Sequence, residues 1–161
     1  MNTANIFINE SLPNRITKLS DTMDSIMVDN YEIKTDRKYL PSHEWVKEQA
    51  DGTFLMGISD YAQKMLREIS YVQFEDKGED YDAKDVITVV EALKATGDIY
   101  APFDCTLLET NDALEDNPEI ISESPYEKGY LIRIKPRSDD RSNLISAEDY
   151  AKIVRDEMDE F

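Results

Sequence analysis

The chain has 161 residues, a length that fits one domain with a substantial hydrophobic core. Its formal net charge of −17 disfavours nucleic acid as a partner, and no apolar run is long enough to span a bilayer, so no membrane contact is expected. The single cysteine, Cys105, cannot form an internal disulfide and fits a reducing compartment.

Residues 1–36 lack the sustained hydrophobic periodicity of the rest of the chain. The first twenty residues contain one acid against two bases, which is weakly compatible with an organelle transit peptide, although three aspartates between residues 21 and 29 fit such a peptide poorly. We therefore predict an N-terminal extension over 1–36, either a transit peptide or a disordered segment, ahead of a domain over 37–161.

From Tyr39 onward the pattern predicts a small, mainly β domain with short helices. Ser59 and Ser146 are suited to cap the N-termini of two helices, each followed by apolar residues at helical spacing. Alternating or apolar runs bounded by turn residues predict strands around residues 45–46, 53–58, 71–74, 86–90, 99–101, 106–110 and 130–134.

One predicted hairpin contains a conspicuous lysine. The run 86–90 enters it, the run 99–101 leaves it, and a polar turn with Gly97 lies between them. Lys94 at the tip would hold its amine in water on a rigid support, which suits a modifying enzyme. An ordinary solvated lysine explains the turn equally simply.

Groups for catalysis are scarce in this sequence. His43 is the single histidine, the five glycines are never close together, and no calcium-loop motif occurs. We therefore predict no catalytic residue and no metal site, and expect a protein that is acted upon rather than one that acts.

Several blocks, in order and spacing, closely resemble one family, the lipoyl-carrying H proteins of the glycine cleavage system. The matching blocks are Tyr39–Val46, Gly57–Gln63, Val90–Ala95, Asp98–Pro102, Asn111–Leu114 and Ser124–Tyr130. The resemblance implies a barrel-sandwich hybrid of two small antiparallel sheets with short flanking helices, and places Lys94 at the exposed hairpin tip.

The resemblance also implies that Lys94 carries lipoic acid through an amide bond. Such an arm, with a reach on the order of 10–15 Å, would take an aminomethyl group from a pyridoxal-phosphate glycine decarboxylase to a folate-dependent aminomethyltransferase. A dihydrolipoyl dehydrogenase would then reoxidise it, and lipoylation enzymes would attach it. The protein would be a non-catalytic carrier, expected to be a monomer with transient partners.

In this family the loaded arm folds into a cleft, and the matching positions here are Ser42, Glu44 and Asp98. Carboxylates and a hydroxyl suit a cationic aminomethyl nitrogen as hydrogen-bond acceptors. Ordinary surface charge is the alternative role for Glu44 and Asp98, and packing is the expected role of His43 and Trp45.

The sequence departs from the family pattern at two turns. Asp104-Cys105 stands where the family commonly has glycine, which would strain Cys105 if that position requires a positive φ. Arg67 stands where glycine is usual after the first helix.

Other functions remain open at this point. A protein that relays lipoyl groups to other enzymes, or binds lipoate in another pathway, would share Lys94 but has less need of the cleft. An unmodified acidic interaction module is a further alternative, whereas Leu93-Lys94-Ala95 argues against a 2-oxo acid dehydrogenase lipoyl domain and a biotin carrier. The expected compartment is the mitochondrial matrix or a related organelle, with the bacterial cytoplasm as the alternative.

Overall fold

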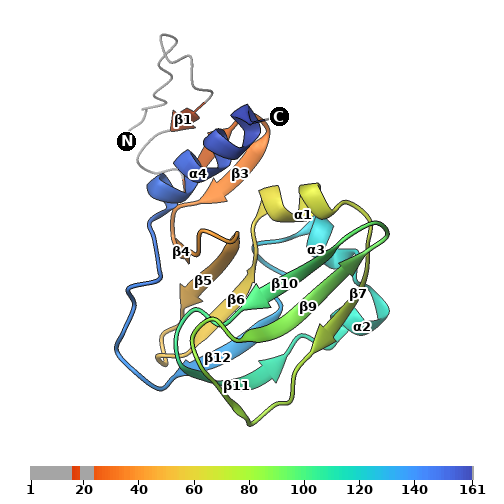
Figure 1. Cartoon of the computed structure of the whole chain (residues 1–161), viewed down its shortest axis with the longest axis vertical. Coiled ribbons are helices and arrows are strands. Elements are labelled where there is room, and N and C mark those ends of the chain that lie inside the picture. Colours follow the sequence, from red (N-terminus) through yellow and green to blue (C-terminus); the bar gives the residue numbers. More distant parts are fainter. Residues whose placement is uncertain (1–15, 19–23, 161) are drawn as a thin grey trace.

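The computed structural model describes residues 16–18 and 24–160, which form three antiparallel sheets and four helices (Figure 1). The largest sheet has the strand order β4-β5-β6-β12-β11-β8. Its strands are β4 (Lys38–Tyr39), β5 (Glu44–Glu48), β6 (Phe54–Ile58), β8 (Asp80–Tyr81), β11 (Cys105–Thr110) and β12 (Ile132–Pro136). The predicted mainly β, antiparallel architecture is confirmed.

A second sheet, in the order β10-β9-β7, packs against the first. It consists of β7 (Ile69–Phe74), β9 (Val86–Ala92) and β10 (Thr96–Tyr100). Buried residues of both sheets share one core, among them Met56 and Ile134 from the large sheet and Val90 and Ile99 from the smaller one. This packing presents the outer end of the β9–β10 hairpin to solvent.

The large sheet buries side chains on both faces at β5. Val46 belongs to the core between the two sheets, whereas its neighbour Trp45 belongs to a second core on the opposite face. Trp45 pairs with Gly57 across the strands, and a Cβ on Gly57 would come within 2.7 Å of the indole ring. Glycine is required there because the tryptophan occupies the space of a side chain.

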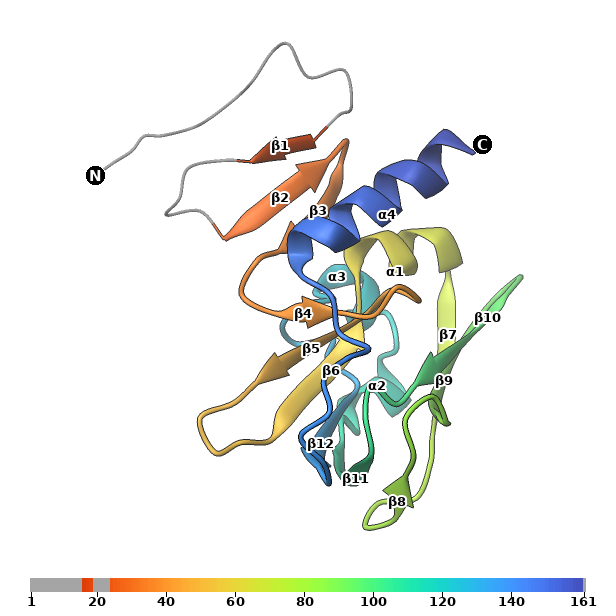
Figure 2. The same cartoon turned by 60° about the vertical axis from the view of Figure 1, so that its left-hand side comes forward.

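The third sheet covers this second core together with a C-terminal helix (Figure 2). It consists of β1 (Ile16–Lys18), β2 (Ser25–Val28) and β3 (Tyr31–Lys34) in chain order, and α4 (Ala147–Asp159) packs beside it. Ile26, Val28 and Ile33 are buried against aromatic residues of the domain. Part of the predicted extension 1–36 is therefore folded chain.

The remaining residues of that extension, 1–15 and 19–23, lie outside the described residues, and so does the part of the transit-peptide prediction that falls on them. The domain boundary at residue 37 stays a prediction. In the part of the chain that the structure describes, no helix is long and apolar enough to cross a membrane.

Both predicted helix caps are confirmed. Ser59 accepts a hydrogen bond from the Ala62 N–H at the start of α1 (Asp60–Leu66), and Ser146 accepts one from the Asp149 N–H at the start of α4. Two one-turn helices, α2 (Ala113–Asp116) and α3 (Ile120–Glu123), lie between β11 and β12.

The prediction that Gly97 belongs to the hairpin turn is wrong. Gly97 lies within β10 and pairs with Val90, and the turn consists of Leu93 and Lys94 between Ala92 and Ala95. A Cβ on Gly97 would contact the Leu66 side chain at 3.4 Å. That distance is an ordinary van der Waals contact, so neither a turn nor a lack of space explains the glycine.

Candidate functional site

Lys94 lies at the solvent-exposed tip of the β9–β10 hairpin, which projects from the body in Figure 2. The Ala92 N–H donates to the Ala95 carbonyl at 2.8 Å and the Leu93 N–H donates to the Glu68 carbonyl at 3.0 Å, so the tip backbone is anchored. Among the described residues, the structure records no hydrogen bond or ion pair to the Lys94 amine. The geometry fits a lysine that is open to acylation.

Glu44 is fully buried where β5 faces β10. Its Oε1 accepts the Ser42 hydroxyl at 2.5 Å, and its Oε2 accepts the Tyr100 N–H at 2.8 Å. Burial raises the pKa of Glu44, while these two hydrogen bonds act in the opposite direction. This carboxylate links the two sheets and orients the Ser42 hydroxyl.

A cavity of about 300 Å³ lies beside β10, between that strand, α1 and α4. Its polar wall consists of Ser42, His43, Asp98 and Glu157. Its apolar wall consists of Ile58, Tyr61, Ala62, Met65, Leu66 and Ile99. The structure thus brings Ser42 and Asp98 to one cavity, whereas Glu44 lies behind Ser42 and is not part of the wall.

Sequence reasoning missed His43 and Glu157 as members of this wall. The His43 Nε2 lies 3.1 Å from the Glu157 carboxylate, and Nδ1 lies 2.8 Å from the Tyr150 hydroxyl. Burial lowers the pKa of His43, although Glu157 opposes that shift. No local pattern joins positions 43 and 157; only the docking of α4 brings them together.

Trp45 packs as expected, and its indole N–H reaches the Ile58 and Pro125 carbonyls.

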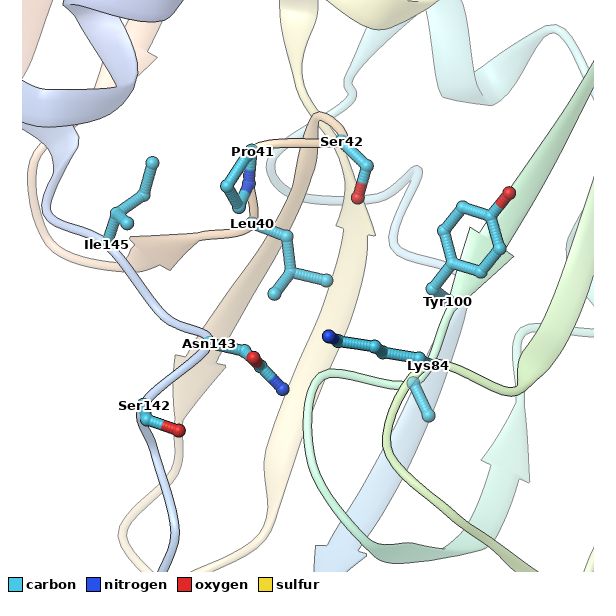
Figure 3. Close-up of a pocket in the computed structure, with 9 residues that line it drawn as sticks. Leu40, Pro41, Ser42, Lys84, Tyr100, Ser142, Asn143 and Ile145 are labelled. Carbon is cyan, nitrogen blue, oxygen red and sulfur yellow. The ribbon is translucent and has the colours of Figure 1, made fainter.

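A second cavity, of about 510 Å³, lies on the other side of Ser42 (Figure 3). Leu40, Tyr100 and Ile145 contribute apolar surface to it, and the Lys84 side chain extends across it toward Asn143. The Lys84 ammonium makes this cavity a poorer place for a cation than the cavity that Asp98 and Glu157 line.

The two departures at turns have different outcomes. Neither Asp104 nor Cys105 has a positive φ, so Cys105 is not strained; it is a fully buried residue of β11 whose pKa burial raises to about 12. Arg67 does adopt a positive φ, of 70°, where it ends α1.

Among the described residues, no group of three or more His, Cys, Asp or Glu side chains could hold a metal ion.

Comparison with known proteins matches most of the chain to one family. The family model "Glycine cleavage H-protein" matches residues 37–157. A glycine cleavage system H protein from Psychrobacter sp. (strain PRwf-1) is 44% identical over 119 residues, covering 73% of this chain and 94% of the relative. A probable glycine cleavage system H protein from Thermococcus gammatolerans is 41% identical over 131 residues, covering 80% of this chain and 97% of the relative.

A solved structure agrees with these sequence matches. The crystal structure of a glycine cleavage system H protein from Mycobacterium marinum superposes with a TM-score of 0.68 at 32% identity, covering 74% of this chain and 97% of that one. The expected barrel-sandwich fold is thereby confirmed. The chain belongs to the glycine cleavage H-protein family.

Proposed function

We propose that Lys94 carries lipoic acid in amide linkage and that the protein serves glycine cleavage as an aminomethyl carrier. Membership of the H-protein family supports a non-catalytic carrier role in that system. The proposed partners are the glycine decarboxylase, the folate-dependent aminomethyltransferase, the dihydrolipoyl dehydrogenase and the lipoylation enzymes. The lipoyl group would supply a disulfide that accepts the one-carbon unit and its electrons.

The observation that carries the proposal is the placement of an open lysine relative to an acidic cavity. Asp98 in β10 follows Lys94 in the turn by four residues, so their Cα atoms lie at most about 14 Å apart. An arm with a reach on the order of 10–15 Å, attached at Lys94, can therefore return along β10 to the cavity. This spacing supports a carrier that shelters its cargo in the cavity.

Within the cavity, we assign Ser42 and Asp98 to the cationic end of the arm and Glu44 to the support of Ser42. Because the Ser42 hydroxyl donates to Glu44, its lone pairs remain for an ammonium N–H. Asp98 is exposed and supplies a carboxylate from the same strand that leads to Lys94. The apolar wall would exclude water from the methylene stem.

Intact-mass measurement of the protein from its native source tests lipoylation. We expect a lipoyl-sized increment that disappears in Lys94→Arg and persists in Lys152→Arg, a matched change at an exposed lysine of α4. Consistent absence of the increment would leave the unmodified acidic module as the function.

Incubation of the lipoylated protein with glycine and its decarboxylase separates a carrier from a lipoyl relay. We expect glycine-dependent release or exchange of CO2. A lipoylated protein that supports neither reaction would be a relay.

For the compartment, we propose a bacterial cytoplasm or a mitochondrial matrix, and two observations favour the former. The relatives described above come from bacteria and an archaeon. Cleavage near Asp36–Tyr39 would also remove strands β2 and β3, which bury Ile26, Val28 and Ile33. Sequencing the mature N-terminus tests this: a start near Asp36–Tyr39 would establish a cleaved presequence.

A further inference from the structure

Two carboxylates from distant parts of the chain line the cavity beside β10. Asp98 lies on β10, and Glu157 lies near the end of α4. Glu44 is unavailable to a ligand there, because it is fully buried and each of its oxygens already accepts a hydrogen bond. A ligand in the cavity therefore meets Asp98 and Glu157 as its acidic groups.

A chain of hydrogen bonds holds Glu157 at the cavity wall. An ionised carboxylate only accepts, so His43 Nε2 carries the proton and donates to Glu157. Nδ1 of the neutral ring then accepts the Tyr150 hydroxyl, which accepts the Ser59 hydroxyl at 2.5 Å. Tyr150 is fully buried and stacks on Tyr39 at 4.4 Å, so the imidazole rests on a rigid support.

Glu157 retains room for a further donor. Its side chain is 37% exposed, and His43 Nε2 lies 3.1 Å from each of its two oxygens. A carboxylate offers about four acceptor positions, so two remain for a ligand. Burial lowers the pKa of His43 and so disfavours a positive charge on the imidazole, although Glu157 opposes that shift.

We propose that Asp98 and Glu157 form a binding site for a primary ammonium group on a short aliphatic thioether stem, with His43 as the positioning residue for Glu157. Ile58, Leu66 and Ile99 on the apolar wall would contact the stem. The inference rests on the proposed function insofar as the aminomethyl end of a lipoyl arm is such a group. Because Glu157 belongs to α4, the proposed site includes the C-terminal helix, and binding of the amine requires α4 to be folded and docked.

The test uses the full-length protein without lipoylation, so its outcome does not depend on whether Lys94 is modified. The probe is 2-(methylthio)ethylamine, and 2-(methylthio)ethanol is its neutral counterpart. We expect the amine to cause saturable NMR shifts at the amides of Gly97, Asp98 and the end of α4. The alcohol should bind more weakly, because it lacks the charge that the carboxylates attract.

The decisive comparison is between two neutralised acids on α4. Glu157→Gln keeps an acceptor for His43 and removes the charge, so the Kd of the amine should rise roughly threefold to tenfold, as for a partly exposed charge-assisted contact. Asp156→Asn makes the same charge change next to the cavity, at a residue that does not line it, and should leave the Kd unchanged. Equal Kd values for both variants, or no saturable shift in the parent, would overturn the proposal.

His43→Asn tests the positioning role. Asparagine tolerates the φ of 86° at this position but is too short to take the place of the imidazole between Tyr150 and Glu157. We expect weaker binding of the amine and unchanged binding of the alcohol. Equal weakening of both probes would show that the variant only distorts the cavity. Absence of the lipoyl increment from the parent protein in the intact-mass measurement would refute the proposed carrier function and leave this comparison intact.

Discussion

The buried Glu44 carboxylate joins two sheets that share no backbone pairing. It lies on the same face of β5 as Val46 and meets β10 through the Tyr100 N–H. Burial raises its pKa, so the folded state binds its proton more tightly than the unfolded chain does. The free energy of unfolding that Glu44 contributes is therefore highest below its pKa in the unfolded chain. It decreases as the pH rises and reaches its lowest value above its pKa in the folded state.

Glu44→Gln should remove this pH dependence. Relative to the parent, the variant should gain stability as the pH rises from about 4.3, the ordinary glutamate pKa, through the raised pKa of the folded state. Urea unfolding across this range measures the difference. Glu48→Gln, at an exposed position of the same strand, should show no such trend. A constant difference between Glu44→Gln and the parent would contradict the assignment.

Arg67 carries backbone strain at the end of α1. Its φ of 70° lies in the region that favours glycine, and its N–H still donates to the Gln63 carbonyl at 2.9 Å. Arg67→Gly should therefore stabilise the protein by about 1 kcal/mol, or raise Tm by about 3 °C. Differential scanning calorimetry measures the change in Tm. As a control, Arg67→Lys retains the strained backbone and should leave Tm unchanged. A lower Tm for Arg67→Gly would refute the expectation.

At the scale of elements, the β2–β3 hairpin is part of the second core. The Glu32 N–H donates to the Asp60 carboxylate at 2.9 Å, the Tyr126 hydroxyl donates to the Glu32 carbonyl at 2.6 Å, and Lys64 donates to the Asn30 carbonyl at 2.9 Å. These contacts tie the hairpin to α1 and to the segment before β12. The hairpin also supports the face on which α4, and with it Glu157, docks.

Ile33→Ala tests this integration. Ile33 is fully buried, so the truncation should cost about 2–5 kcal/mol of unfolding free energy. Ile153→Ala, at a half-buried position of α4, should cost less because solvent already reaches that side chain. Urea unfolding of both variants gives the comparison, and equal costs would mean that the hairpin is not packed as described.

At the scale of the whole molecule, the net charge of −17 produces a strongly negative field. A carrier that visits several enzymes in turn benefits from fast association, which complementary charge supplies, and from weak final complexes. The proposed partners should therefore present basic surfaces around their active-site entrances.

Salt should weaken these encounters. The Debye length shortens from about 10 Å at 0.1 M to about 3 Å at 1 M, so the KM of the decarboxylase for the lipoylated protein should rise by about tenfold over that range. Steady-state kinetics at increasing potassium chloride measure it, with sucrose as an uncharged control. A KM that does not change with salt would exclude electrostatic steering.

Local patterns account for most of the strands and for both capped helices. Alternation in the stretch that becomes β12, with Ile132 and Ile134 buried and Lys135 exposed, is a period-2 signal that any buried sheet face imposes. Ser59 and Ser146 were identifiable because a cap depends only on the next three residues. Gly97 misled because a glycine in a polar stretch is typical of a turn, whereas its pairing with Val90 across the hairpin places it in β10.

The sequence by itself determined the family and the lysine at the hairpin tip, because these follow from motifs and short-range periodicity, whereas the association of Ser42 with Asp98 was implied only by the family resemblance. Only the tertiary structure decided that Glu44 is buried, that Cys105 is unstrained and that His43 and Glu157 complete the cavity. Burial and cavity walls depend on which distant elements pack together, here α4 against the turn before β5. That packing follows from the summed apolar contacts of the second core, which no local stretch of sequence displays.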